Sequence, residues 1–228
     1  MNLIFKTVGA ALGLALAVNA HAAPISPTYN TFGPLPAATF GGSGIPNDAV
    51  AITTVGGLTL AMSATQRFTA PALTNDGMGT YSALTGVSTA SPSPADPYAM
   101  WNFNFYISGG DDTMAFRLFY DFNTAVGNDE TTHGTISFLG SQLPGGVAQN
   151  SFNLGMNFLA AAGAGIAPPA GAFDPNAAGQ YTFALVAYGI TSGQEIGRSA
   201  IVVNVPEPGT FALSGLALLG LAGLRRRA

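Results

Sequence analysis

Residues 181–205 read YTFALVAYGITSGQEIGRSAIVVNV, and this stretch decides the fold class of the chain. Every second residue from Tyr181 to Ala187 is apolar or aromatic. Because successive side chains of a strand point to opposite faces, this pattern predicts a β-strand. Residues 189–193 contain two glycines and predict a turn. The valine-rich residues 197–205 alternate again, so the whole stretch predicts an antiparallel hairpin.

Upstream of this hairpin, residues 100–108 show the same alternation in its clearest form. Four large apolar side chains fall on one face of the expected strand: Trp101, Phe103, Phe105 and Ile107. A second aromatic strand is expected over residues 114–122, and the stretch 109–112, Gly-Gly-Asp-Asp, predicts a turn between the two. We therefore expect a second hairpin whose apolar faces enter the core.

The rest of the body predicts shorter strands and no helix. Strands are expected over residues 49–55, 58–62, 79–84 and 134–139, with Gly56-Gly57 as a hairpin turn and a weaker strand signal over 152–158. Many short strands separated by turns are typical of sandwiches. The sequence therefore predicts an all-β protein, an antiparallel β-sandwich formed by one body over residues 23–204.

The closing hairpin also resembles that of immunoglobulin-like and fibronectin-like sandwiches. The similarity lies in the order glycine, Tyr181, Phe183, Leu185, then a turn and a valine-rich strand. It implies an immunoglobulin- or fibronectin-like sandwich in which Tyr181 caps the sandwich edge. It implies no activity, because such sandwiches carry many unrelated functions.

Composition narrows the function classes. Only 8% of residues are charged, whereas about a quarter is usual, and 48% are hydrophobic. This balance argues against a disordered chain. The body carries a net charge of −7, since three arginines face ten carboxylates, and it offers no cationic groove for a phosphate backbone. We expect no nucleic-acid partner. The chain has no cysteine, which excludes disulfides and thiolate chemistry.

The N-terminal residues 1–22 predict a secretory signal peptide. Lys6 supplies the positive charge, an apolar run follows over residues 8–18, and Ala20-His21-Ala22 fits the rule of small residues around a cleavage site. We expect cleavage between Ala22 and Ala23. The alternative is an uncleaved N-terminal membrane anchor.

The C-terminal residues 205–228 predict a membrane-held tail. Residues 211–224 carry no charge, and fourteen helical residues span roughly 21 Å, a short membrane helix compared with a hydrocarbon core of about 30 Å. Arg225, Arg226 and Arg227 resist translocation and predict a C-terminus on the cytoplasmic side. Pro206 and Pro208 favour extended structure just before the span, which makes that segment accessible to a processing enzyme.

This tail resembles the PEP-CTERM sorting signal. The resemblance rests on Pro206-Glu207-Pro208, the apolar span and the terminal arginine cluster, in that order. It implies processing near this motif by exosortase, a membrane protease or transpeptidase of Gram-negative bacteria. It also implies tethering at the inner membrane followed by transfer to the cell surface, in systems often linked to exopolysaccharide. The alternative is an ordinary C-terminal anchor that is not processed.

Candidate chemistry in the body is sparse. After signal removal His133 is the only histidine, which excludes a zinc site built on several histidines, and its polar loop predicts a solvated side chain. The stretch 121–130 is rich in oxygen ligands, and Asp121, Asn123, Asp129 and Glu130 form a candidate calcium site. The alternative for these residues is a solvated turn. We expect no other cofactor.

Two further sets of residues are candidates for carbohydrate chemistry. Asp111 and Asp112, joined with Asp121 and Asp129, are candidates for the carboxylate pair of a glycoside hydrolase. Tyr106 and Tyr188 lie opposite the main apolar faces and are the best candidates for a sugar-stacking platform. The alternative for both tyrosines is the second face of a packed sheet.

Together these features predict an exported cell-surface or extracellular matrix protein that is not an enzyme. Its expected role is structural or adhesive, linked to exopolysaccharide or biofilm. Its expected partners are the membrane, through the tail, an exosortase, and an extracellular polysaccharide. A secreted carbohydrate-binding module is the first alternative, and a secreted hydrolase, which needs a cleft with two converging carboxylates, is the second.

Overall fold

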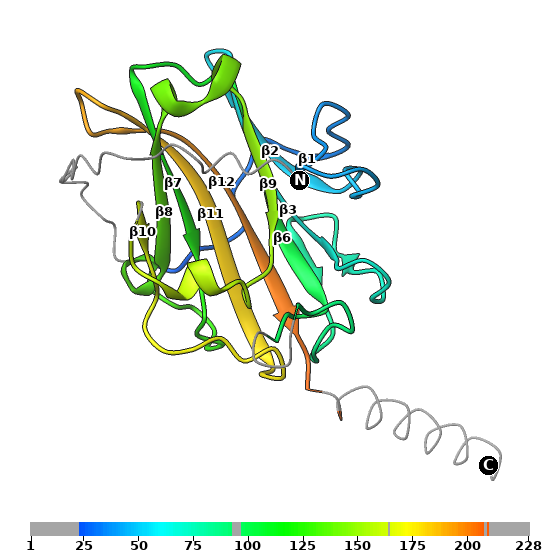
Figure 1. Ribbon diagram of the computed structural model, residues 1–228. Helices are drawn as coiled ribbons and strands as arrows, with labels where there is room; N and C mark the ends of the chain where they lie inside the picture. The colour runs from blue at the N-terminus through cyan, green and yellow to red at the C-terminus, as the bar shows by residue number, and fades with distance from the viewer. Residues whose placement is uncertain (1–22, 93–96, 164, 208, 210–228) are drawn as a thin grey trace, which may run out of the picture.

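The protein is an all-β molecule in which two sheets pack face to face (Figure 1). The computed structural model describes residues 23–92, 97–163, 165–207 and 209. The smaller sheet has the strand order β1-β2-β3-β6-β9, and the larger has the order β10-β8-β7-β11-β12-β5-β4. This architecture confirms the predicted all-β, sandwich-like fold.

The five strands of the smaller sheet are antiparallel neighbours. They are β1 (Thr31–Gly33), β2 (Val50–Val55), β3 (Leu58–Gln66), β6 (Trp101–Ser108) and β9 (Ala148–Phe152).

The larger sheet contains one parallel pair. Its strands are β4 (Thr74–Asn75), β5 (Thr80–Ser82), β7 (Met114–Tyr120), β8 (Gly134–Leu139), β10 (Ile166–Ala167), β11 (Gly179–Gly189) and β12 (Glu195–Val205). β5 runs parallel to β12, with Val202 opposite Thr80, and the other pairings are antiparallel.

The helical elements among the described residues are four short 3-10 helices. They are η1 (Glu130–Thr132), η2 (Gly140–Gln142), η3 (Pro144–Gly146) and η4 (Asn157–Ala160). The weak strand signal over residues 152–158 is therefore placed too late, because β9 ends at Phe152 and η4 begins at Asn157.

The closing hairpin forms as its sequence predicts. β11 and β12 pair antiparallel from Gly179 opposite Val205 to Tyr188 opposite Glu195, with a bulge at Ala187/Tyr188. The predicted core face is confirmed, because Tyr181, Phe183, Leu185 and Ala187 all belong to the main hydrophobic core.

The second expected hairpin is wrong. β6 pairs with β3 and β9 in the smaller sheet, whereas β7 pairs with β8 and β11 in the larger one. The Gly109–Asp112 turn therefore carries the chain from one sheet to the other. Gly109 has a φ of +80°, and a Cβ there would lie 2.3 Å from the carbonyl oxygen of Gly57, so this crossing fits tightly against the β2–β3 turn.

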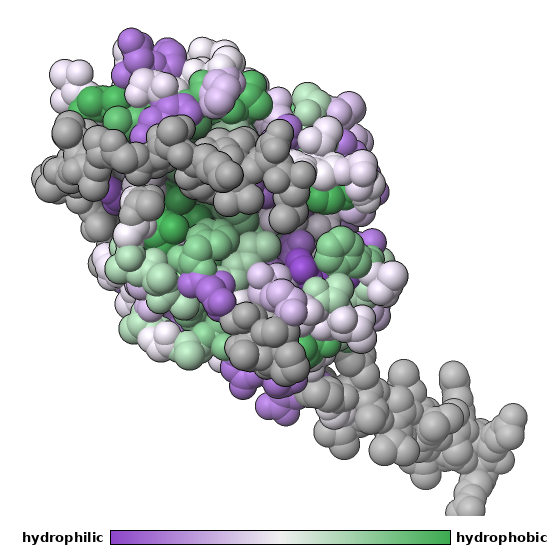
Figure 2. All heavy atoms as spheres, in the orientation of Figure 1, coloured by the Kyte–Doolittle hydropathy of each residue, from purple (hydrophilic) through white to green (hydrophobic). Residues whose placement is uncertain are grey.

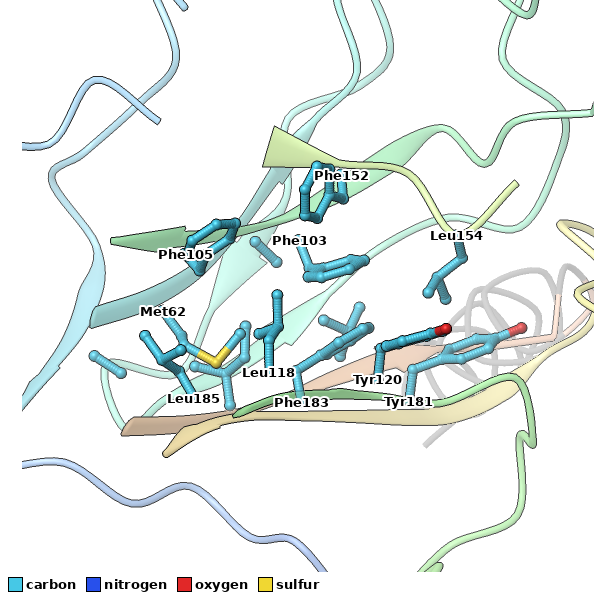
Figure 3. Close-up of a cluster of buried hydrophobic side chains, with 14 of the residues drawn as sticks. Met62, Phe103, Phe105, Leu118, Tyr120, Phe152, Leu154, Tyr181, Phe183 and Leu185 are labelled. Atoms are coloured by element: carbon cyan, nitrogen blue, oxygen red, sulfur yellow. The ribbon is translucent and has the colours of Figure 1, made fainter. Parts of the chain in front are cut away.

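The core is built from aromatic side chains of both sheets. Figure 3 shows Phe103 and Phe105 facing Phe183 and Leu185 across the space between the sheets. The Phe103 and Phe183 rings stack with centroids 4.5 Å apart, and the Trp101 ring lies 5.4 Å from that of Tyr181. Each such buried aromatic contributes roughly 1.5–3 kcal/mol of transfer free energy, so the core holds the sandwich without disulfides.

Candidate functional site

The sorting motif begins where a central strand ends. β12 lies between β11 and β5, and its last residue, Val205, is 2% exposed. The next residues leave the fold, because Pro206 is half-buried and Glu207 is exposed. Figure 1 shows the chain departing from the orange end of β12. The motif is therefore presented at one end of the sandwich and outside its core.

Most of the tail lies outside the described residues. These undescribed positions include Pro208, the predicted span 211–224 and the three terminal arginines. Among the residues that the structure does describe, no helix is long and apolar enough to cross a membrane.

The N-terminal segment that would follow signal cleavage packs on the outer face of the larger sheet. Residues 1–22, including Ala22, lie outside the described part, and Ala23 is exposed. The N–H of Glu130 donates to the Ala23 carbonyl at 3.1 Å, and Thr28 forms two backbone hydrogen bonds with Ala200. Ile25 is buried against Phe119 and its neighbours. The segment therefore behaves as part of the body.

This segment forms one wall of a surface cleft of about 890 Å³. The floor comes from the outer face of the larger sheet, where Arg117 of β7 and Arg198 of β12 both lie beside Val186 of β11. The other walls are η1 with its flanking residues and the turn 192–195. The volume falls within the usual range of ligand sites, about 300–1,000 Å³.

Arg198 is the best-paired cation of this cleft. Its guanidinium donates to Glu195 at 2.9 Å and to Glu130. Burial alone would lower the pKa of Arg198, but the hydrogen bonds and charges of Glu195 and Glu130 raise it above its usual value. The Arg198 guanidinium is therefore engaged in ion pairs that hold η1 against β12.

Arg117 is the cation that faces the cleft with no carboxylate partner among the described residues. Its guanidinium lies 5.6 Å from the ring centroid of Tyr188 and 5.9 Å from that of Phe119. Burial, together with the charge of Glu130, raises the pKa of Tyr188 to about 12, so its hydroxyl stays protonated. Arg117 thus places a half-buried cation over the Tyr188 ring.

Sequence reasoning overlooked this cleft. A usable signal existed, because two of the body's three arginines lie within strands that are otherwise apolar. A charge in such a strand marks a solvent-facing position.

The candidate calcium ligands do not gather around a common point. Asp121 is fully buried, and its carboxylate accepts from the N–H of Asn123 at 2.8 Å and from the side chain of Asn128 at 2.7 Å. Asp129 caps η1 and accepts from Thr131, whose two hydrogen bonds lower the pKa of Asp129. The described residues contain no group of three or more acidic or histidine side chains suited to a metal ion.

The remaining two candidate calcium ligands, Asn123 and Glu130, also have other roles. The side chain of Asn123 accepts from the N–H of Ala125 in a local turn, and Glu130 pairs with Arg198. The geometry therefore gives no support to a calcium site, because the four residues are occupied in turns and an ion pair. The alternative of a solvated turn does not hold for all of them either, since Asp121 and Glu130 are buried.

The expectation of a solvated His133 is wrong. Its side chain is fully buried, with Nε2 lying 2.7 Å from the Thr182 hydroxyl and 3.6 Å from the Asp121 carboxylate. Nδ1 lies 3.0 Å from the Asp129 carbonyl oxygen. These contacts join the 121–133 loop to β11, so His133 is a buried linking residue.

The carboxylate pair expected for a hydrolase is not assembled. Asp111 precedes β7 and Asp121 follows it, so the seven residues of that strand separate them. At about 3.4 Å per residue this separation exceeds 20 Å, whereas hydrolase carboxylates lie about 5–9.5 Å apart. Asp111 is occupied by Thr113, whose hydrogen bonds lower the pKa of that carboxyl. Asp112 lies in the same exposed turn.

Neither candidate tyrosine forms an exposed platform. Tyr106 is 6% exposed and packs beneath Ala38 and Phe40, and Tyr188 is 3% exposed beneath Arg117. Both tyrosines therefore lie on the second face of a packed sheet, as the alternative interpretation predicted. Figure 2 shows only scattered hydrophilic residues on the visible face, as the low charge content predicts.

Comparison with known proteins identifies the tail. The family model of the PEP-CTERM protein-sorting motif matches residues 204–227. No curated protein and no solved structure matches the chain. The match covers the last residues of β12, the exposed Glu207 and the tail beyond. The chain therefore carries a C-terminal PEP-CTERM protein-sorting motif, which marks it as an exported protein that an exosortase sorts to the cell surface.

Proposed function

We propose that the protein is a non-catalytic component of the cell surface or extracellular matrix of a Gram-negative bacterium. Its role is structural or adhesive and is linked to exopolysaccharide or biofilm. The observation that supports this proposal is the sorting motif joined directly to the end of β12. A folded body that reaches the surface intact, with its carboxylates used in turns and ion pairs, suits binding or scaffolding better than catalysis.

In this proposal both ends of the chain are processed. The signal peptide is removed after Ala22, the tail is held in the inner membrane, and the exosortase cuts within residues 206–210. The exposed Glu207 supports this site, because a protease needs an accessible, extended substrate and the fold stops at Val205.

Mass spectrometry of the mature protein from the surface fraction of its native host tests this proposal. We expect a terminus between residues 206 and 210, with the arginine tail absent. The variant Glu207→Ala should accumulate in the membrane fraction with an intact tail, whereas the control Asp112→Ala, at the opposite end of the body, should mature normally. An intact Ala228 on the surface protein would contradict processing.

We further propose that the sandwich is of the immunoglobulin- or fibronectin-like kind. The Tyr181 hydroxyl donates back to the carbonyl oxygens of Asp174 and Ala177, at 3.4 and 3.3 Å, just before β11 begins its core section. A tyrosine bonded to the backbone a few residues upstream is a hallmark of such sandwiches.

A second candidate function is binding of an acidic polysaccharide in the cleft. The specific observation is Arg117, a half-buried cation with no carboxylate partner among the described residues, over the ring of Tyr188. Guanidinium groups bind carboxylates through charge-assisted hydrogen bonds, so a uronic acid unit suits this position.

Calorimetry with uronic acid oligosaccharides tests this candidate. Arg117→Gln should weaken binding by about tenfold, the loss expected for one charge-assisted hydrogen bond. Arg67→Gln, a matched loss of charge far from the cleft, should leave the affinity unchanged. Equal losses in the two variants would show that only net charge matters.

A further inference from the structure

Of the seven exposed large apolar side chains described in the body, Met78, 64% exposed, lies in the β4–β5 turn partway along β12, and two valines lie at the far end; the other four lie together at one end. Two of them, Phe68 and Val126, are 72% and 79% exposed. Leu84 and Val87 are each 44% exposed. We call these four residues the apolar rim, because they lie at one end of the sandwich.

Strand pairing places the rim at the end from which the tail departs. Gly179 pairs with Val205, and the N–H of Gln180 donates to Thr124, two residues before Val126. The N–H of Ala83 donates to Asn204, so Leu84 lies next to the last residues of β12. The rim therefore surrounds the exit of the chain.

Phe68 belongs to the same end through the smaller sheet. Gln66 pairs with Trp101, whose ring packs on Tyr181 near the start of β11. Val87 forms an isolated bridge with Ala99, just before β6. Both sheets thus contribute apolar side chains to one end.

The backbone at Phe68 holds its ring outward at a cost. Its φ is +47°, in the left-handed region that residues other than glycine rarely adopt. The Arg67 guanidinium lies between two rings, 4.9 Å from the centroid of Phe68 and 4.4 Å from that of Tyr98. Such an outlier in an exposed apolar residue needs a reason beyond packing.

The opposite end of the sandwich is different. The exposed large apolar residues described there are Val55, in the β2–β3 hairpin, and Val147, beside the Gly110 turn. They are 37% and 38% exposed. These two positions provide matched controls, because they are valines on turns at the far end of the same body.

The tail determines what covers the rim. Six residue steps join Val205 to Phe211, the first residue of the apolar span, and even a fully extended chain crosses at most about 20 Å in six steps. β12 alone, with eleven residues, is about 37 Å long. A body tethered so closely keeps the rim near the lipid headgroups whenever the span is in the membrane.

We propose that the apolar rim rests on the outer surface of the membrane that holds the tail, with Phe68 and Val126 entering the boundary between headgroups and acyl chains. This inference rests on the membrane-held tail of the proposed function. Contact by apolar side chains at such a boundary reaches about 5–10 Å deep. It orients the body upright and leaves the 206–210 segment between rim and lipid, where a membrane-embedded protease works.

Charge has a small part in this contact. Arg67 is a cation at this end, and the exposed carboxylates described there are Glu207, just beyond β12, and Asp174, whose neighbour Pro175 accepts a hydrogen bond from Gly86. This end carries no cationic patch, so the contact depends on apolar side chains and should not weaken when salt is raised.

Site-directed fluorescence on the full chain tests the inference. The chain has no cysteine, so single cysteines can be placed at 68, 87 and 126, with controls at 55 and 147, and labelled with an environment-sensitive dye. The protein is reconstituted in phosphatidylethanolamine–phosphatidylglycerol vesicles. We expect a blue shift and quenching by lipids with shallow quenchers at the rim positions, in low and high salt, and neither effect at the controls.

Vesicle flotation separates the two ways in which the inference can fail. A chain that does not float with the vesicles refutes the membrane-held tail and the rim contact with it. A chain that floats with a water-like dye at all rim positions refutes the rim contact alone. A dye at the rim that changes only when exosortase is added also refutes lipid contact and identifies the protease as the occupant.

Discussion

Tyr120 and Tyr181 are both fully buried, yet their hydroxyl groups are bonded very differently. The Tyr120 hydroxyl donates to the Leu159 carbonyl oxygen at 2.6 Å, a short bond that ties η4 to β7. The Tyr181 hydroxyl reaches its two carbonyl partners only at 3.3 and 3.4 Å. Short hydrogen bonds contribute more, so the two residues stabilise the fold to different degrees.

We therefore expect Tyr120→Phe to lower the free energy of unfolding by about 1–3 kcal/mol, because it leaves the Leu159 carbonyl group buried without a partner. Tyr181→Phe should cost less than about 1 kcal/mol. Urea unfolding of both variants measures the difference. Equal losses would show that the length of each hydrogen bond does not reflect its contribution to the free energy of unfolding.

Buried tyrosines also predict how stability depends on pH. Burial raises the pKa of Tyr188 to about 12, and it raises the pKa of Tyr81, Tyr120 and Tyr181 as well. A group whose pKa is higher in the folded state keeps its proton longer there than in the unfolded chain. Its contribution to stability is therefore complete below pH about 10 and is lost as pH rises toward the folded pKa.

We expect the urea midpoint to be level up to pH about 10 and to fall between about 10 and 12. Tyrosinate absorbance should appear together with unfolding. The urea midpoint of the Tyr188→Phe variant should fall less steeply over the same pH interval. A midpoint that stays level to pH 12 would contradict the burial of these hydroxyl groups.

Among the elements, η1 is held to β12 by the ion pair of Glu130 with Arg198. The Glu130 side chain is 10% exposed, whereas that of Glu195 is 41% exposed. Removing the partner of a mostly buried charge costs far more than removing an exposed one.

Arg198→Met should therefore lower the free energy of unfolding by about 2–3 kcal/mol, because Glu130 stays buried without a counterion. Glu195→Gln should cost less than about 1 kcal/mol. Both values come from urea titrations at pH 7. If Glu195→Gln lowers the free energy of unfolding more than Arg198→Met does, the exposed pair of Glu195 with Arg198 contributes more than the buried one.

Sequence patterns predicted strands well and their partners poorly. Alternation over residues 101–107 identifies a strand with an apolar face, because the period of two is a local property. It does not select a neighbour, because β6 and β7 both have apolar faces. The choice between a hairpin and a crossing depends on the close approach of Gly109 to Gly57, which lies 52 residues earlier in the chain. Which strands become neighbours is decided by tertiary contacts, and a local pattern does not contain them.

The candidate site was harder to predict for the same reason. Asp121 and His133 lie in a stretch whose composition predicts a solvated loop, yet both are buried. Thr182 of β11 supplies a partner for His133, and Asn123 and Asn128 supply partners for Asp121. Oxygen-rich composition alone cannot separate a metal site from a set of capped turns. The presence of the sorting motif was predicted correctly, because its recognition depends on linear order and not on folding.

At the scale of the whole molecule, the body ends where the sorting motif begins. Asn204 and Val205 pair with Gln180 and Gly179, and no strand pairing is described beyond Val205. The fold should therefore be independent of the tail.

We expect a chain of residues 23–207 to unfold cooperatively in urea. A chain of residues 23–203 should lose about 2–4 kcal/mol, because it removes the buried Val205 and the last pairs of the hairpin. Thermal unfolding of the two chains gives the comparison. Failure of the longer chain to fold would show that the tail contributes to the body.

The position of β12 between β11 and β5 has a mechanical consequence. Once the C-terminus is fixed at the cell surface, drag on the protein enters the molecule through Val205 and runs along β12. The ladder hydrogen bonds lie across that direction, so the load shears the ten pairs with β11 and the three with β5 together. Strands loaded in this way rupture as a block and do not unzip pair by pair. The sandwich is thus joined to its sorting tail through a strand that is well placed to bear tension.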